Sequence, residues 1–345
     1  MMQTALKPKQ RIEYIDVLRG LGIIIMIMGH VGFGGKFDRF IHTFHMPLFF
    51  FISGYLFTKR DSFSMVSLVK KKARQLLIPY ICFGIFHYII WVLFVRTTQS
   101  FSTPLISLVS YNTKNMPIAG ALWFFTALFF TEVFYSFFTY RIHNEKLLTA
   151  VIFTVSAATM VITTYTDLRL PLTIDIALAA IGFYHIGRIL RSVADKNNIV
   201  TEIKNKSFRY LCFGVLLFAV TLVIAFINGY VNMKSGWYAI IPLSVVNAII
   251  GSVAIFVFAV FIDEKIHFLK GILIFIGKNS IVYLCLNQVV ILLITNLIGP
   301  TMGNMGYFTI PTFTASCINL VLSTVVLSVC VLIFNKTFLK FVIGK

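Results

Sequence analysis

The sequence predicts an all-α integral membrane protein with about ten transmembrane helices and both termini in the cytoplasm. Of its 345 residues, 58% are hydrophobic and only 12% are charged, and the mean hydropathy is +0.89. Soluble domains have about 25% charged residues, so this composition places the chain in a bilayer. The net charge of +18 does not indicate a nucleic-acid partner, because the basic residues lie in short segments between apolar spans.

Apolar spans make up most of the chain, and long apolar runs with few charges are candidate membrane helices. Gly, Pro and Asn turn signals separate the spans. The segments between them are too short for a folded extramembrane domain, so we expect residues 1–345 to form a single membrane domain. The ten expected spans begin near Ile15, His42, Leu77, Ile118, Leu147, Leu172, Tyr210, Trp237, Ser280 and Pro311.

The distribution of Lys and Arg gives the expected orientation. One set of loops and ends carries 23 of the 30 basic residues, and the opposite set carries six. Loops rich in Lys and Arg stay in the cytoplasm, so both termini are expected there and the number of spans should be even. The remaining basic residue, Arg19, then lies near the inner surface, and His30 lies toward the outer half.

The first apolar span contains two basic side chains, Arg19 and His30. They are eleven positions apart, which on a helix is about three turns and a rise of roughly 16 Å along one face. An arginine inside a membrane helix costs roughly 3 kcal/mol, so both side chains should face a cavity or a partner rather than lipid. A neutral imidazole can accept a hydroxyl proton near neutral pH, which makes His30 a candidate general base. The alternative is a structural histidine that hydrogen-bonds between helices.

Two groups of cationic side chains could bind an anionic cofactor near the inner surface. Arg19 suits a phosphate or carboxylate, or it pairs with Asp16 one turn earlier. Both hold together if Asp16 orients Arg19. Lys71, Lys72 and Arg74 precede the third span, and such a cluster can grip the phosphates of a nucleotide. The alternative is that these residues only set the topology.

Two further histidines, His42 and His45, open the second span on the outer side. Because the chain returns there after His30, three imidazoles are expected at one depth. We expect them to line a pocket rather than hold a metal, since no acidic or thiolate ligand stands beside them in the sequence. The five cysteines lie in apolar spans without a CxxC pair and are expected to be free thiols.

Acidic and amide side chains also occur within the apolar spans. Glu132 falls in the inner half of the fourth span, and Asp175 lies near the outer start of the sixth. Acids at such depths are functional hypotheses by default, and they would suit a proton-coupled transporter. The alternatives are pairing with an Arg or His on a neighbouring helix, or a polar patch under a loop. Asn287 and Gln288 in the ninth span are expected to hydrogen-bond across helices.

Several motifs together resemble the membrane acyltransferase-3 family in its fucose 4-O-acetylase-like form. Arg19 and His30 fit its Arg-x10-His signature, and Lys71-x-x-Arg74 is similar to its Arg-x-x-Arg pair. Lys71 replaces an Arg there, and Asn287 stands where the late helix of the family often has His. The other similar segments are Tyr14–Gly20, Phe44–Tyr55, Ile78–Tyr80, Leu122–Phe125 and Gly277–Ile281.

The resemblance implies an O-acyltransferase of the bacterial cytoplasmic membrane. Its partners would be a cytoplasmic acyl-CoA, with acetyl-CoA as the usual donor, and a glycan or glycolipid whose hydroxyl is the acceptor. No metal is implied. His30 would be the general base, assisted by Arg19 and Asp16, or it would carry the acyl group covalently. The residues expected to bind CoA are Arg19, Lys71, Lys72 and Arg74, and those expected to bind the acceptor are His42, His45, Trp123, Glu132 and Asp175.

Two other functions fit a polytopic chain of this kind. A transporter or flippase for a sugar or glycolipid would use Glu132, Asp175 and the histidines as proton sites, and many such proteins have two related halves. No internal repeat is visible here. A polymerase or ligase of lipid-linked glycans would carry a large charged outer loop, whereas residues 99–117 contain one basic residue and no acid. Acetyl and longer acyl groups, and several glycan acceptors, fit the acyltransferase hypothesis.

Overall fold

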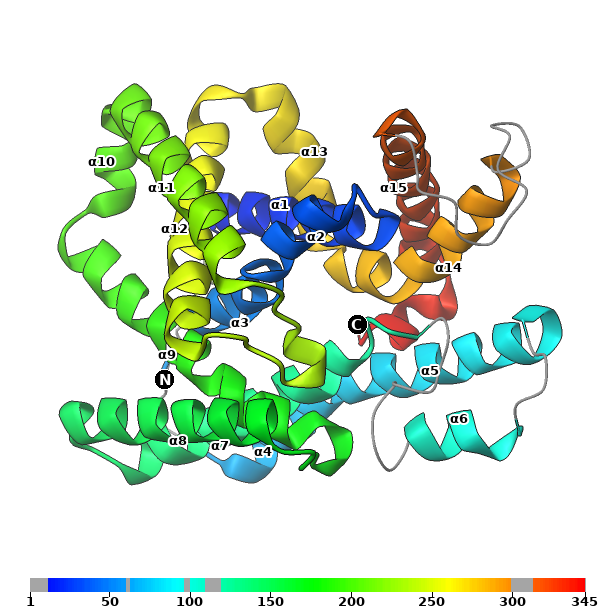
Figure 1. Ribbon diagram of the computed structural model, residues 1–345, viewed down its shortest axis with the longest axis horizontal. Coiled ribbons are helices and arrows are strands. Elements are labelled where there is room, and N and C mark those ends of the chain that lie inside the picture. Colours follow the sequence, from blue (N-terminus) through cyan, green and yellow to red (C-terminus); the bar gives the residue numbers. More distant parts are fainter. Residues whose placement is uncertain (1–11, 60–62, 96–99, 109–118, 299–312, 345) are drawn as a thin grey trace, which may run out of the picture.

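The computed structural model describes residues 12–59, 63–95, 100–108, 119–298 and 313–344, and within these ranges the fold is all-α, with one isolated β-bridge between Asn232 and Trp237 (Figure 1). Eight of the described helices are long and apolar enough to cross a membrane. The chain is therefore a multi-pass membrane protein, as predicted, while the number ten and the cytoplasmic termini stay predictions. The eight are α1 (Glu13–Val31), the continuous helix Met65–Phe94, α8 (Glu145–Tyr165), Pro171–Lys196 with α9 (Ile174–Lys196), α11 (Ser207–Asn228), α12 (Ile241–Lys265), α14 (Ser280–Ile298) and α15 (Phe313–Lys336).

Two of the ten expected spans differ from a regular membrane helix. The segment expected from His42 is α3 (His45–Tyr55), whose 11 residues would extend only about 16 Å. It follows the short α2 (Gly35–His42) and is buried almost throughout. The segment expected from Ile118 is α7 (Trp123–Arg141), in which buried Thr, Ser and Glu side chains lower the hydropathy. These two helices pack inside the protein, so they do not need the apolar surface that lipid requires.

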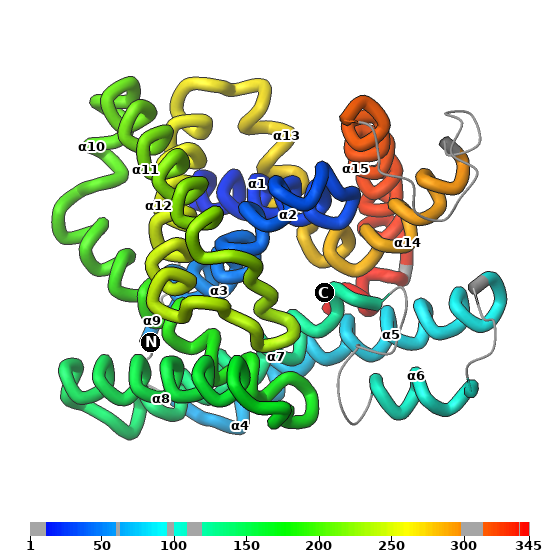
Figure 2. Tube along the Cα trace, viewed as in Figure 1, coloured from blue at the N-terminus to red at the C-terminus, as the bar shows by residue number. Residues whose placement is uncertain are grey.

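Close helix packing at glycines holds α3 and α1 in the interior. A Cβ at Gly54 of α3 would overlap the backbone carbonyl oxygen of Tyr184 in α9, and a Cβ at Gly20 of α1 would overlap that of Leu273 in α13 (His267–Lys278). Small residues let membrane helices approach this closely. As a result α1 lies at the centre of the molecule, surrounded by α3, α12, α13 and α14 (Figure 2).

Replacing Gly54 by Ala should destabilise the protein by about 1–3 kcal/mol, because the added methyl meets backbone atoms that cannot move without separating α3 from α9. Gly271→Ala is the matched control, since a Cβ there meets nothing within 4 Å and alanine favours the helix. Thermal unfolding of the purified protein in detergent measures both. Equal melting temperatures for the two variants would contradict the close packing.

The helix Met65–Phe94 changes its winding near the basic cluster. It runs through α4 (Met65–Lys72), the π-helical η1 (Ala73–Leu77), α5 (Ile78–Ile90) and the π-helical η2 (Trp91–Val95). Pro79 cannot donate a hydrogen bond to the previous turn, and its ring would crowd the carbonyl of Gln75. The wider π-turn of η1 relieves this conflict. It also carries Arg74, beside which the C-terminal η8 (Phe338–Ile343) ends: a Cβ at Gly344 would lie 2.8 Å from the Arg74 carbonyl oxygen.

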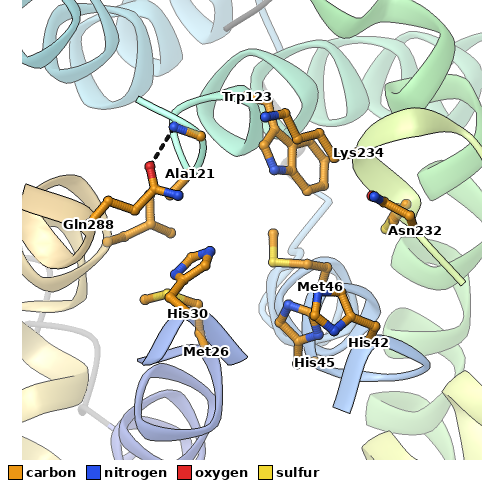
Figure 3. Close-up of a pocket in the computed structure, with 13 residues that line it drawn as sticks. Met26, His30, His42, His45, Met46, Ala121, Trp123, Asn232, Lys234 and Gln288 are labelled. Carbon is orange, nitrogen blue, oxygen red and sulfur yellow. Dashed lines mark hydrogen bonds between the residues drawn. The ribbon is translucent and has the colours of Figure 1, made fainter. Parts of the chain in front are cut away.

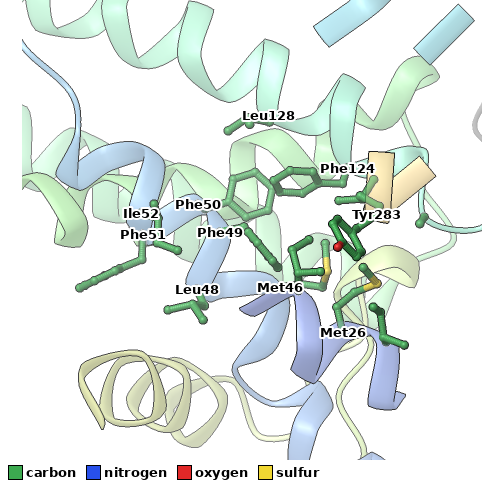
Figure 4. Close-up of a cluster of buried hydrophobic side chains, with 14 of the residues drawn as sticks. Met26, Met46, Leu48, Phe49, Phe50, Phe51, Ile52, Phe124, Leu128 and Tyr283 are labelled. Atoms are coloured by element: carbon green, nitrogen blue, oxygen red, sulfur yellow. The ribbon is translucent and has the colours of Figure 1, made fainter. Parts of the chain in front are cut away.

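The core of the protein is rich in aromatic side chains and surrounds the central α1 helix. Phe49 and Phe50 of α3 pack edge-on against Phe124 of α7, with ring centroids 5.7 and 5.2 Å apart. Met26 of α1 and Met46 of α3 continue this cluster (Figure 4). Both methionines also reach a cavity, so the rigid core forms one wall of the site described next.

Candidate active site

A cavity of about 160 Å³ opens at the C-terminal end of α1. Figure 3 shows His30 and Gln288 on one side, His42 and His45 on another, and Trp123 and Lys234 across from them. The three imidazoles predicted to gather at one depth therefore do so. The lining residues are Met26, His30, His42, His45, Met46, Gly120, Ala121, Trp123, Asn232, Met233, Lys234, Leu284 and Gln288.

His30 lies in the last turn of α1 beside Asn287 of α14. The amide nitrogen of Asn287 donates to the backbone carbonyl oxygens of Tyr283 (3.2 Å) and Leu284 (2.6 Å), so both of its hydrogens are used. Asn287 Oδ1 and His30 Nδ1 are both buried, and neither has a hydrogen-bond partner among the described residues. Because Oδ1 can only accept, a neutral His30 that donates to it from Nδ1 would keep Nε2 as its basic nitrogen.

His42 and His45 are held by backbone carbonyls of their own helical segment. His42 Nδ1 donates to the Asp38 carbonyl oxygen at 2.6 Å, and His45 Nδ1 donates to the Ile41 carbonyl oxygen at 2.9 Å. The rings lie edge to face with centroids 4.9 Å apart. With Nδ1 protonated, each Nε2 can accept a hydrogen bond from a hydroxyl. Burial raises the pKa of the Asp38 carboxyl, which accepts a hydrogen bond from the Phe33 N–H at 3.3 Å.

Gln288 presents a hydrogen-bond donor to the cavity. Its Oε1 accepts a hydrogen bond of 2.6 Å from the backbone N–H of Gly120, in the turn before α7 (Figure 3). An N–H can pair only with the oxygen of a side-chain amide, so this bond fixes which way the amide points. The Nε2 end is then a hydrogen-bond donor beside the cavity that Gln288 lines (Figure 3). A Cβ at Gly120 would lie 2.7 Å from Gln288 Nε2, which explains the glycine.

Several lining residues are absent from the sequence-based site. Trp123 was expected and lies in the cavity, but Gln288, Asn232, Lys234 and the three methionines were not assigned to it. The pair of adjacent amides in an apolar span was the one signal that pointed to Gln288, which hydrogen-bonds to the turn before α7 rather than to another helix. The loop between α11 and α12, which contributes Asn232 and Lys234, has no sequence motif that would place it over His30.

The other predicted site residues lie outside this cavity. Lys72 Nζ lies 2.7 Å from Glu132 Oε2, so Glu132 pairs with a lysine rather than with the Arg or His considered for it. Arg19 pairs with Asp16, with Nη1 3.6 Å from Oδ1, and its side chain is 33% exposed.

The remaining charged candidates also lie away from the histidines. Lys71 and Arg74 are exposed on the helix Met65–Phe94. Asp175 is buried in the first turn of α9. The structure thus brings together His30, His42, His45 and Trp123, and it separates the basic cluster and both acids from them.

Comparison with known proteins gives the family of the chain. A family model described as an acyltransferase domain matches residues 12–334, which is nearly the whole chain and includes every helix that lines the cavity. No curated protein matches the sequence. The chain therefore belongs to the acyltransferase-3 family and is a multi-pass membrane acyltransferase.

Proposed function

We propose that this protein is an O-acyltransferase of the bacterial cytoplasmic membrane that moves an acetyl group from acetyl-CoA to a hydroxyl of a cell-surface glycan or glycolipid. The observation that carries the proposal is the setting of His30. One ring nitrogen is buried beside the acceptor oxygen of Asn287, and the ring lines a cavity with five other polar side chains. That arrangement suits a general base better than a structural histidine, which would have both nitrogens satisfied by the protein.

In the proposed reaction, His30 acts on the acceptor hydroxyl and Gln288 acts on the thioester of the donor. His30 Nε2 removes the proton of the acceptor hydroxyl, whose oxygen attacks the thioester carbonyl carbon. Gln288 Nε2–H donates to the carbonyl oxygen, where negative charge develops. The C–S bond then breaks, the ester forms, and the leaving CoA sulfur takes the proton from the imidazolium. Every proton and electron pair is accounted for without a metal.

The exposed basic side chains outside the cavity favour a donor that reaches the cavity from them. Lys72 is compensated by Glu132, so Lys71 and Arg74 are the members of the cluster best able to bind the phosphates of CoA. Arg19 lies about 16 Å from His30 along the continuous helix α1. An elongated donor would have its nucleotide at the basic end and its thioester at the cavity.

The function is tested with purified protein in lipid nanodiscs, radiolabelled acetyl-CoA and a glycan extract as acceptor. We expect release of free CoA thiol together with incorporation of label as an alkali-labile ester. A transporter or flippase would consume no thioester, so unchanged acetyl-CoA in the presence of protein that still binds CoA would reject the proposal.

Arg74→Ala should weaken CoA binding by about tenfold, since a charged hydrogen bond to phosphate contributes about 1.5 kcal/mol. Arg74→Lys should lose less, because it keeps the charge but not the bidentate geometry. Titration calorimetry with CoA measures both, and Lys146→Ala is the control for an exposed cation elsewhere. Unaltered affinity in Arg74→Ala would remove this residue from the donor site.

A further inference from the structure

Met26 lies between the two basic residues of α1. It follows Arg19 by seven positions and precedes His30 by four, and residues spaced by three or four positions share one face of a helix. Its side chain is 2% exposed and lines the cavity one helical turn from His30, on the side of Arg19. A donor that reaches His30 along α1 from Arg19 must therefore pass Met26.

Met46 lies at the same level as the methionine of α1, because the chain from α2 into α3 runs antiparallel to α1. A Cβ at Gly29 would lie 3.7 Å from Ile41. Two helical turns earlier in α1, a Cβ at Gly22 would lie 3.0 Å from Phe49. Met46 falls between these two contacts, and Figure 3 shows its side chain reaching into the middle of the cavity.

Leu284 completes this level from a third helix. Gly277 of α13 packs against the backbone carbonyl of Asp16, near the start of α1. Asn287 of α14 lies beside His30, in the last turn of α1, so the α13–α14 segment runs parallel to α1. Leu284 precedes Asn287 by about one turn and also lines the cavity. The three side chains that share this level, Met26, Met46 and Leu284, form what we call the apolar layer.

The cavity beside the apolar layer has room for few atoms. Its volume of about 160 Å³ is close to that of an engineered protein cavity of about 150 Å³ that holds one benzene molecule, which has six carbon atoms. The reacting atoms of an acetyl transfer are about as many: the hydroxyl oxygen and its carbon, and the sulfur, carbonyl carbon, carbonyl oxygen and methyl of the thioester. An acetyl group therefore fits, whereas each further methylene requires the surrounding side chains to move.

We propose that Met26 and Met46 determine which acyl groups reach His30, and that they select acetyl over longer acyl thioesters. The inference rests on the proposed function and deepens it by naming the residues that select the donor. The thioester passes between the two methionines, whose unbranched side chains change rotamer to admit a narrow group. Its carbonyl then lies between His30 and Gln288, with the acyl methyl inside the cavity.

The selectivity between acetyl-CoA and butyryl-CoA tests the proposal, with the purified protein in nanodiscs and the same glycan extract as acceptor. Wild-type protein should prefer acetyl-CoA by at least about tenfold in kcat/KM, since one methylene in a tight pocket changes this constant by roughly 10–200-fold. Met26→Ala and Met46→Ala should each lower the preference about tenfold. The ratio of the two constants does not depend on the folded fraction, so a destabilised variant still reports it.

Met160→Ala is the matched control, because Met160 is a methionine of α8 as buried as Met26 that is not among the residues lining the cavity. It should lose similar stability and keep the acetyl preference within about twofold. Met46→Val removes less volume than Met46→Ala and should give an intermediate preference.

Two outcomes would overturn the assignment of the methionines: a wild-type protein that uses both thioesters equally, or an unchanged preference in Met26→Ala and Met46→Ala. If the wild-type protein left both thioesters intact, the acyltransferase function itself would be rejected instead.

Discussion

Replacing His30 by Gln is expected to lower acetyl transfer by about 10²–10⁴-fold, the usual contribution of a positioned general base. Glutamine fills similar space and keeps hydrogen-bonding capacity, but it cannot take the proton of the acceptor hydroxyl. Binding of CoA should stay nearly intact, because the basic cluster lies elsewhere on the molecule. The rate of CoA thiol release under saturating acetyl-CoA measures the loss.

A control substitution shows whether the loss of activity is specific to His30 or follows from replacing any histidine. His143 is exposed in the turn between α7 and α8, and His143→Ala should retain the wild-type rate. Full turnover by His30→Gln would remove the base from the mechanism. Trapping of label on the wild-type protein, and not on His30→Gln, would favour the covalent acyl-histidine alternative over direct transfer.

Asn287 provides a second test of the same base. Asn287→Leu removes the oxygen that orients His30 and should lower kcat with little change in the KM for acetyl-CoA. Asn287→Asp keeps the acceptor oxygen but adds a negative charge that stabilises the imidazolium. Its pH–rate profile should therefore shift to higher pH, a change that a purely structural asparagine would not produce.

Replacing Gln288 by Glu is expected to lower kcat by about 10²–10³-fold, the usual cost of losing one donor to a developing oxyanion. A carboxylate still accepts the hydrogen bond from the Gly120 N–H, so the local structure has its partner. It offers no N–H to the thioester carbonyl, and its charge opposes the one that develops there. The substitution therefore isolates the donated hydrogen bond from the structural one.

Two measurements complete the test of Gln288. Thermal unfolding of Gln288→Glu should match the wild-type protein within a few degrees, while Gln288→Leu should be less stable because the Gly120 N–H loses its acceptor. The decrease should appear in kcat and not in the affinity for CoA. A Gln288→Glu enzyme with near-normal kcat would exclude Gln288 from the stabilisation of the transition state.

Much of the candidate site is visible in short sequence motifs. The spacing of Arg19 and His30 predicted a shared helix face, and α1 runs unbroken through both positions. His42 and His45 were expected at the depth of His30 and line the same cavity. These predictions were possible because they depend on helical periodicity and on the short connection between the first two apolar segments, which are local properties.

Other features depend on contacts that the sequence does not reveal. Apolar composition indicated a full membrane span at α3, yet this helix has only 11 residues. Gly54 lets it pack closely on α9, inside the protein. Glu132 could be a proton site or a partner for a base, and only its 2.7 Å distance from Lys72 decides between them. Lys234 was predicted only as a charge in an outer loop, and the structure places it in the lining of the cavity.

The sequence by itself determined the class of the protein, its family and the histidines of its cavity, because hydropathy and motif spacing are properties of short continuous segments. The tertiary structure alone decided which polar groups face those histidines. Asn287, Gln288 and Lys234 meet His30 across distances of more than 200 residues, and such contacts depend on how the helices pack. The fold therefore supplies the hydrogen-bond partners on which the proposed chemistry rests.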